Sequence, residues 1–268
     1  MFSCNDCKNA AENNDLTKSK ILDKVKTLAV TKYSYIIDSG KYVKGGMISK
    51  LKSHYDEKGM EVDVNVYNKD EYLTNKFQTS NNDKGQKLES KDFKPDGSLG
   101  RKIAYKYDNS GNMTEINLYT ASDSLVYKGE KKYDNQCNEI EYNEYESTGK
   151  LTKRATYKYD EKRNGIEVNY YSPDGSIINK YTRKYDSKNN MIELLMYNNS
   201  NTLLSKSLYK YDDKGNNVEA KRYHADGSLS NQSFFKYEYD KNSNWIKMIE
   251  YNTENIPVRL EERMIEYY

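Results

Sequence analysis

Two columns of side chains that could do chemistry recur along the chain at regular spacing. The acidic column contains Asp63, Glu89, Glu115, Glu141, Glu167, Glu193 and Glu219. The aromatic column lies four residues later in each case and contains Tyr67, Phe93, Tyr119, Tyr145, Tyr171, Tyr197, Tyr223 and finally Tyr251. Carboxylates can transfer protons or bind metal ions, and evenly spaced tyrosine rings can stack on sugar rings.

The acidic column favours structural ion pairs over catalysis. A catalytic pair needs two carboxylates in different environments, whereas these are equivalent residues, one in each unit. A lysine column recurs at the same spacing and contains Lys106, Lys132, Lys158, Lys184 and Lys210. We therefore expect no catalytic residue and no enzyme, and we expect the two columns to lie side by side on a solvated face.

The aromatic column is the best candidate for ligand binding. Its candidate residues are Tyr119, Tyr145, Tyr171, Tyr197 and Tyr223, to which we add Trp245, the single tryptophan of the chain. Tyrosine rings also cover a thin sheet while their hydroxyls stay in water. The sequence leaves both roles open, as a ladder for sugars and as structural cover.

The three cysteines, Cys4, Cys7 and Cys137, exclude a disulfide framework because their number is odd and they lie far apart. A zinc site would need further ligands, and His54 and His224 stand at unrelated spacings without partners for a catalytic triad. We expect no metal and no cofactor. The first four residues resemble the end of a lipoprotein cleavage site, which makes Cys4 the candidate lipidation residue.

The charge balance limits the possible partners. With 43 Lys and Arg against 41 Asp and Glu, the net charge is only +2, and no basic patch indicates nucleic acid. No apolar stretch is long enough for a membrane helix, so membrane contact is expected only through a lipid on Cys4. We expect a monomer on the bacterial cell envelope, lipid-anchored at the outer surface or in the periplasm, or cytoplasmic if no leader precedes Cys4.

A repeat of 26 to 28 residues must position these columns. Its opening pairs are Tyr55-Asp56, Asn81-Asn82, Tyr107-Asp108, Tyr133-Asp134, Tyr159-Asp160, Tyr185-Asp186, Tyr211-Asp212 and Tyr239-Asp240. Each opening pair leads into a turn of the type Asp-x-x-Gly-Asn, and a second turn such as Pro-Asp-Gly follows the second aromatic residue. Where Gly is replaced by Cys137 or Arg163, the following Asn tolerates the left-handed conformation.

Two turns in each unit predict two strands, and therefore about eight tandem antiparallel β-hairpins. The fold class is all-β: one long twisted or spiralling meander sheet with a short N-terminal helix or tether. Pairing the two columns across the hairpins favours a four-residue loop, in which Lys210 faces Glu219 and Tyr211 faces Val218. A three-residue loop with a bulge is the alternative. A sheet of this many strands is expected to spiral into a shell, to close, or to stay a long ribbon, and an open form would leave an exposed edge at either end.

The N-terminal part differs from the repeat. Residues 1–16 read as a flexible tether that carries Cys4. Ile21, Leu22, Val25 and Leu28 have helical spacing after Thr17. Residues 17–54 are thus predicted to form a short helix and a degenerate capping repeat with a turn at residues 38–40, and residues 55–268 to form the hairpin array.

The Tyr-Asp opening, the x-x-Gly-Asn turn and the later Asp-Gly turn resemble YD-repeat proteins of the Rhs type, over about Tyr55 to Tyr268. The segment from Tyr237 to the end resembles the end of small bacterial surface lipoproteins built from such repeats. The resemblance implies a secreted or surface-exposed hairpin array, which in large members forms a shell around a toxin. The repeats here are too few to enclose a cargo domain.

These observations predict a non-catalytic surface or periplasmic repeat protein that binds a macromolecular partner, either protein or polysaccharide. Two alternatives remain open at this stage. One is a carbohydrate-binding module that uses the tyrosine ladder, and the other is an immunity or antitoxin-like protein that binds a toxin.

Overall fold

The computed structural model describes residues 15–18 and 21–268, and these residues form an antiparallel β-hairpin meander. The all-β prediction is therefore confirmed. The predicted tether and its candidate lipidation residue Cys4 lie outside the described residues, except for the tether's last two positions. The elements are α1 (Asp15–Lys18), β1 (Val25–Asp38), β2 (Lys41–Tyr55), β3 (Glu61–Tyr67), β4 (Leu73–Asn81), β5 (Lys87–Phe93), β6 (Leu99–Tyr107), β7 (Met113–Thr120), β8 (Leu125–Tyr133), β9 (Glu139–Glu146), β10 (Leu151–Tyr159), β11 (Gly165–Tyr171), β12 (Ile177–Tyr185), β13 (Met191–Asn198), β14 (Leu203–Tyr211), β15 (Asn217–His224), β16 (Leu229–Tyr239), β17 (Trp245–Tyr251) and β18 (Pro257–Tyr267).

The chain divides into two compact units. Unit 1 comprises the described part of Met1–Gly111 together with Ile116–Val126 and Lys236–Tyr268, and unit 2 comprises Asn112–Glu115 and Tyr127–Phe235. In unit 1, antiparallel pairing runs from β1 through β2, β3, β4 and β5 to β6. In unit 2 it runs strand by strand from β8 to β16.

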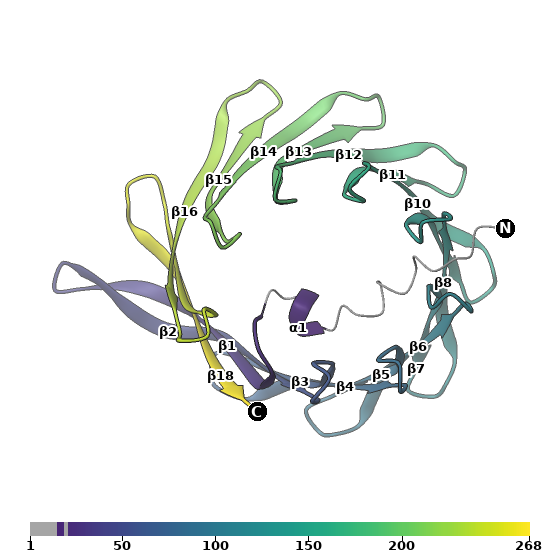
Figure 1. The fold of residues 1–268 in the computed structure, drawn as a ribbon, viewed down its shortest axis with the longest axis horizontal. Coiled ribbons are helices and arrows are strands. Elements are labelled where there is room, and N and C mark those ends of the chain that lie inside the picture. The colour runs from purple at the N-terminus through teal and green to yellow at the C-terminus, as the bar shows by residue number, and fades with distance from the viewer. Residues whose placement is uncertain (1–14, 19–20) are drawn as a thin grey trace. The chain divides into compact units, whose positions relative to one another are not determined.

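The first and last strands of the chain pair with each other. In unit 1, β1 lies between β2 and β18, and β18 pairs in turn with β17 (Figure 1). The open form of the sheet, with an exposed edge at either end, is therefore wrong. Val25 of β1 lies opposite Tyr267 and is fully buried, so this pairing also encloses apolar surface. A sheet ordered only by sequence neighbours does not include such a pairing.

A short helix is present, but it ends before the apolar residues Ile21, Leu22, Val25 and Leu28 that predicted it, so the prediction of a helix over those residues is wrong. Helix α1 has four residues, and the chain is a strand from Val25 onward. Leu16, Ile21, Val25, Leu28 and Tyr55 instead form one buried cluster. In β1 the buried side chains include Val25, Thr27, Leu28 and Ala29, so tertiary burial overrides the helical spacing of the apolar residues.

The hairpin turns share one geometry that differs from the favoured prediction. In the turn after Tyr211, Gly215 N donates to Asp212 O at 3.1 Å, and Asp212 N donates to Asn216 O at 2.9 Å. Gly215 has φ +79°, so the loop has three residues and ends in the left-handed conformation. Cys137 (φ +62°) and Arg163 (φ +66°) adopt this conformation themselves, and not the asparagines that follow them.

A register shift beyond each turn restores the predicted charge pairing. Tyr211 lies opposite Asn217, not Val218, but Lys210 lies opposite Glu219, as expected. Val218 is therefore the extra residue of a β-bulge. The same shift occurs between Lys132 and Tyr133. The prediction of a four-residue loop is wrong, whereas the pairing of the lysine and glutamate columns is confirmed.

The tyrosines that open the repeats tie neighbouring hairpins together. The hydroxyls of Tyr107, Tyr133, Tyr159, Tyr185 and Tyr211 each donate to the backbone carbonyl 20 residues earlier, at 2.7 to 3.0 Å. In unit 2 each of these carbonyls belongs to the first residue of a strand, and the acceptor of Tyr159 is Glu139. The hydroxyl of the opening tyrosine thus provides a hydrogen bond to a backbone carbonyl next to each bulge.

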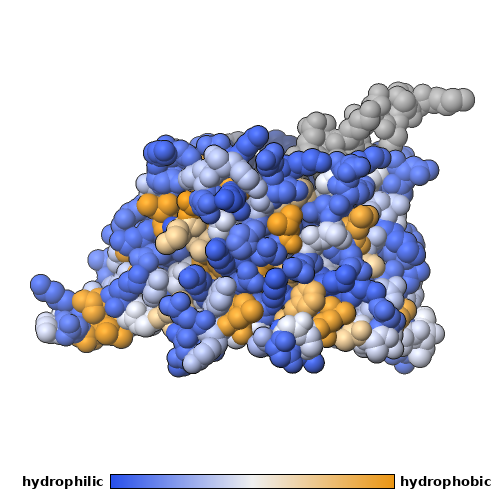
Figure 2. Space-filling model, turned by 90° about the horizontal axis from the view of Figure 1, so that it is seen from below, coloured by the Kyte–Doolittle hydropathy of each residue, from blue (hydrophilic) through white to orange (hydrophobic). Residues whose placement is uncertain are grey.

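Apolar burial is sparse, as the composition indicates. On the face in Figure 2, apolar side chains appear as separate patches among polar ones. No helix among residues 15–18 and 21–268 is long and apolar enough to cross a membrane.

Candidate binding surface

The acidic column of unit 2 lies on one side of its strands, which we call the charged face and define by Glu141, Glu167, Glu193 and Glu219. Across the hairpins, Lys158 lies opposite Glu167 and Lys184 opposite Glu193. Since alternate residues of a strand share a side, Tyr145, Tyr171, Tyr197 and Tyr223 belong to the same face, four residues further along the strands.

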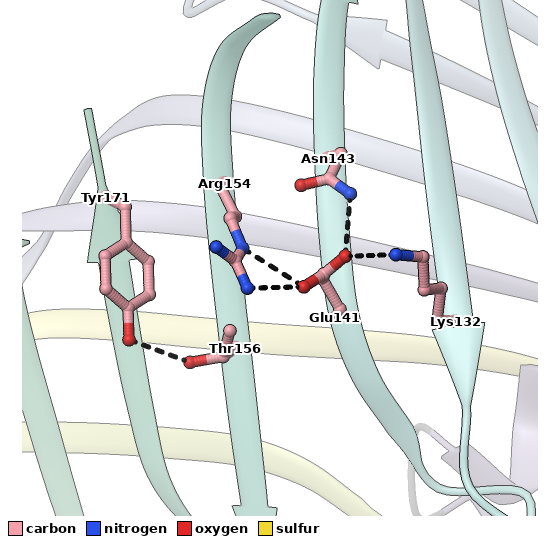
Figure 3. A network of polar contacts seen from close by, with 6 residues as sticks. All are labelled: Lys132, Glu141, Asn143, Arg154, Thr156 and Tyr171. Atoms are coloured by element: carbon pink, nitrogen blue, oxygen red, sulfur yellow. Dashed lines mark hydrogen bonds and ion pairs between the residues drawn. The ribbon is translucent and has the colours of Figure 1, made fainter. Parts of the chain in front are cut away.

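Glu141 is the centre of a polar network on the charged face (Figure 3). Its carboxylate accepts hydrogen bonds from Lys132 Nζ at 2.7 Å, Arg154 Nη2 at 2.7 Å and Asn143 Nδ2 at 2.9 Å. The bond from Lys132, supported by those from Asn143 and Arg154, lowers the pKa of Glu141 to about 2, although burial acts in the opposite direction. The charge is thus held between two cations from neighbouring strands.

The same arrangement recurs along unit 2. Lys158, Lys184 and Lys210 lie 2.7 Å from Glu167, Glu193 and Glu219, respectively. Each lysine is the first cause of a lowered pKa of its partner carboxyl. The pKa of each of these four equivalent carboxyls is shifted in the same direction, which is typical of structural ion pairs, because acid and base catalysis needs groups whose pKa values are pushed apart.

Three of the candidate tyrosines contact cations. The guanidinium of Arg154 lies 5.4 Å from the ring centre of Tyr171, and Lys180 Nζ lies 4.6 Å from that of Tyr197. In unit 1, Lys102 Nζ lies 5.2 Å from the ring centre of Tyr119. The structure therefore gives each of these three rings a cation from the preceding strand, which covers part of the ring.

The cations form a column that the sequence argument missed. Its members are Lys50, Lys76, Lys102, Lys128, Arg154, Lys180 and Lys206, again 26 residues apart. The spacing could have identified them, but their role depends on the register, which places Arg154 and Lys180 directly opposite Tyr171 and Tyr197.

Exposed aliphatic residues accompany the tyrosines at the same strand ends. Ile178 and Leu204 are the extra residues at the register shifts opposite Tyr171 and Tyr197, and they are 46% and 41% exposed. Leu229, which lies opposite Tyr223, is 49% exposed. We call Ile178, Leu204 and Leu229 the apolar row.

The other candidates occupy different environments. Trp245, in unit 1, has the guanidinium of Arg263 3.3 Å from its ring centre and Tyr237 in edge contact at 5.8 Å. Tyr119 also belongs to unit 1. Only Tyr145, Tyr171, Tyr197 and Tyr223 are therefore placed together on one face.

On the opposite face of unit 2, tyrosines pack on one another and on glycine. Tyr170 and Tyr181 form an edge contact with ring centres 5.9 Å apart. A Cβ at Gly129 would lie 2.7 Å from the ring of Tyr142, so any larger residue would have to displace that ring. Burial raises the pKa values of Tyr142 and Tyr157. The tyrosine content thus supplies part of the packing that aliphatic residues supply elsewhere.

Two single-residue expectations need correction. His54 has an acidic partner, since its Nδ1 lies 2.7 Å from Asp63 Oδ1. In the described part of the chain no serine or cysteine is hydrogen-bonded to this imidazole, so the pair does not extend to a catalytic triad. Cys137 is disulfide-bonded, so one disulfide is present although the cysteines exclude a framework of several, and the other two cysteines of the chain lie outside the described residues.

Within residues 15–18 and 21–268, no group of three or more His, Cys, Asp or Glu side chains could hold a metal ion.

No protein-family model matches the sequence, and no curated protein matches it. Solved structures that match the chain include a porin-like protein from Bacteroides uniformis, at 8% identity and a TM-score of 0.48, covering 90% of this chain and 98% of that chain. The Photorhabdus luminescens Tc holotoxin pore matches at 11% identity and a TM-score of 0.30, covering 89% of this chain and 15% of that chain.

A putative outer membrane lipoprotein-sorting protein domain from Vibrio parahaemolyticus matches at 12% identity and a TM-score of 0.27, covering 93% of this chain and 88% of that chain. Likenesses this weak assign neither a family nor a function. The resemblance to YD-repeat proteins stays a prediction.

Proposed function

We propose that this chain is a non-catalytic repeat protein of the bacterial cell envelope that binds a macromolecular partner through the charged face of unit 2. The observation that carries the proposal is the apolar row beside the tyrosines. Ile178, Leu204 and Leu229 are each more than 40% exposed and recur on alternate strands, next to tyrosine rings of which Tyr171 and Tyr197 already hold cations. Exposed apolar groups rimmed by polar ones are typical of interaction sites.

The ion pairs support the non-catalytic part of the proposal. Each carboxylate of the charged face is held by at least one lysine at 2.7 Å, which favours its ionised form. Groups fixed in this way supply a rigid polar pattern, and rigid polar patterns favour specificity over affinity.

Photo-crosslinking tests the site. A photoreactive phenylalanine analogue at Ile178 or Leu204 should crosslink one partner in intact cells of the source bacterium. The matched control carries the analogue at Met264, which is 77% exposed in unit 1. Equal adducts from Met264, or none from either position of the apolar row, would contradict the proposal.

Polysaccharide is the second candidate partner, favoured by the regular spacing of Tyr145, Tyr171, Tyr197 and Tyr223 on one face. In this case Tyr171→Ala combined with Tyr197→Ala abolishes binding on a glycan array. Glycan binding that survives both substitutions excludes the ladder as the sugar site.

The disulfide of Cys137 supports placement in the cell envelope, because disulfides persist in oxidising compartments. A lipid on Cys4 would supply the anchor. Metabolic labelling with a fatty acid should mark the wild-type protein and not Cys4→Ser, whereas equal labelling of both would remove Cys4 from this role.

A further inference from the structure

A small cleft lies in unit 1 beside β4 and β5, apart from the surface proposed above. Its volume is about 230 Å³. Leu73, Phe93 and Pro95 supply its apolar lining, and Lys76, Lys94 and Gln78 supply its polar lining. In the register, Lys76 lies directly opposite Phe93, so an ammonium group and an aromatic ring face the same small space.

The repeat is broken at this cleft in a way that leaves Lys76 without a carboxylate. The equivalent cations elsewhere reach the acidic column: Arg154 lies 2.7 Å from Glu141, and Lys206 lies 3.4 Å from Glu193. The acidic residue that corresponds here is the shorter Asp63, which His54 and Asn65 contact at 2.7 and 3.3 Å. Lys76 forms no ion pair with any described residue.

Lys94 is a second cation that lines the same cleft. Lys94 directly follows Phe93 and is exposed. Its charge contributes to a lowered pKa of Asp96, whose carboxylate is engaged mainly by Ser98, at 2.6 Å from the hydroxyl and 2.8 Å from the backbone N–H. Lys94 likewise has no ion pair within the described part of the chain.

The floor of the cleft also departs from the repeat. Phe93 is the one member of the aromatic column without a hydroxyl. Its ring presents an apolar surface, which Leu73 and Pro95 extend. Among the residues lining the cleft, the polar groups are two ammonium groups and the amide of Gln78.

We propose that this cleft binds a small organic carboxylate whose body has a flat apolar side. The carboxylate lies between Lys76 and Lys94, and the flat side rests on Phe93. Ammonium–carboxylate hydrogen bonds are the strong kind, and they gain strength beside an apolar wall. Clefts for drug-sized ligands occupy roughly 300–1,000 Å³, so this one suits a single ring.

Both sugar acids and aromatic acids have this chemistry. A sugar acid offers its C–H side to Phe93 and its hydroxyls to Gln78, whereas an aromatic acid offers a ring to Phe93 and leaves Gln78 unused. Gln78→Leu distinguishes the two sources, because it weakens binding of the sugar acid alone.

Calorimetric titration of the full chain with glucuronate and with benzoate tests the proposal, and glucose is the neutral control. We expect at least one acid to bind at millimolar concentration or tighter, and glucose not to bind. Lys76→Gln should weaken binding about tenfold, as loss of one charge-assisted hydrogen bond does. Lys206→Gln, the same change five repeats later, should leave the affinity unchanged.

Phe93→Ala should abolish binding. Phe93→Tyr restores the residue of the other repeats, so it is a second variant that should keep the fold. Circular dichroism of each variant reports folding. Binding of neither acid, or binding that Lys76→Gln leaves unchanged in a folded protein, overturns the proposal. Equal binding of glucose and glucuronate also overturns it, because the lysines then play no part.

Discussion

At the scale of single residues, the tyrosines divide by position into groups with different partners. Those that open the repeats bond backbone carbonyls, those of the aromatic column meet cations, and those on the opposite face of unit 2 contact one another. Tyr159 belongs to the first group and Tyr171 to the second. The sequence predicts the columns, but the partners depend on the register and on which side each ring faces.

The bond from an opening tyrosine should contribute measurably to stability. Tyr159→Phe removes the hydroxyl that donates to Glu139 O at 2.8 Å, and we expect a loss of about 1 kcal/mol in the free energy of unfolding. Tyr171→Phe is the matched control, since its hydroxyl lies 3.4 Å from that of Thr156. Urea denaturation measures the free energy of unfolding of both variants. Equal losses would mean that the bond to the carbonyl of Glu139 contributes no more to stability than the contact of Tyr171 with Thr156.

The ion pairs make stability depend on acid pH. The pKa of Glu141 is lowered to about 2 in the folded protein, so the contribution is present above the unfolded pKa of about 4.3 and is lost as pH falls toward 2. Between pH 5 and pH 3 we expect the free energy of unfolding to fall by about 1–2 kcal/mol more in the wild type than in Glu141→Gln.

The control for this pH dependence is Glu161→Gln, which changes an exposed carboxylate in the turn after Tyr159. Its urea denaturation curves should follow the wild type at both pH values. If the free energy of unfolding of Glu141→Gln instead falls between pH 5 and pH 3 as much as that of the wild type, the ion pair with Lys132 contributes nothing to folding.

At the scale of elements, the hairpin combines a three-residue loop with a bulge one position further along. The turn residues predict where each hairpin reverses, and the lysine and glutamate columns predict which residues face each other. Neither signal predicts the bulge. Shortening the loop by one residue shifts the register, and the extra residue of the bulge shifts it back, so Lys210 lies opposite Glu219 with either loop. Only the position of Tyr211, opposite Asn217, distinguishes the two loops.

The left-handed residue in each turn should be sensitive to a side chain. Gly227 has φ +84° and open space around it, so Gly227→Ala meets backbone strain alone. We expect it to lower the free energy of unfolding by about 1–2 kcal/mol. Gly46 also has open space but no positive φ, so Gly46→Ala should leave stability unchanged or raise it slightly. Equal effects in thermal denaturation would contradict this account.

The cleft beside β4 could not be found from the sequence, although its signals are present there. Phe93 and Asp63 each depart from their columns, but each substitution taken alone is conservative. The effect of the two substitutions becomes visible only in the strand register, which places Lys76 opposite Phe93 and lets His54 contact Asp63.

At the scale of the whole molecule, the pairing of β1 with β18 is the feature furthest from sequence prediction. The repeat relates each strand to its neighbours in the chain, but no periodic signal relates Val25 to Tyr267. The apolar start of β1, with Val25 and Leu28 buried, has helical spacing in the sequence and becomes a strand only through this tertiary pairing.

Removing β18 should therefore expose two strand edges at once. A chain that ends at Asn252 leaves β1 and β17 without this partner, and unpaired edges promote association. We expect larger species in size-exclusion chromatography and faster amide exchange in β1, while β12 of unit 2 keeps its protection. Met264→Asp, which alters an exposed side chain of β18 but not its backbone, is the control.

An unchanged elution volume together with unchanged protection of β1 in the shortened chain would mean that β18 is dispensable for the first strand.

The β1–β18 pairing also constrains the order of events during synthesis. Each repeat hairpin joins residues close in sequence and can form as soon as it leaves the ribosome, whereas β1 must wait for a partner more than 200 residues later. Until then its β18-facing edge is open. The chain is therefore most exposed to misassembly while it is nearly complete, and translocation to another compartment before that point would let the last pairing form where the protein resides.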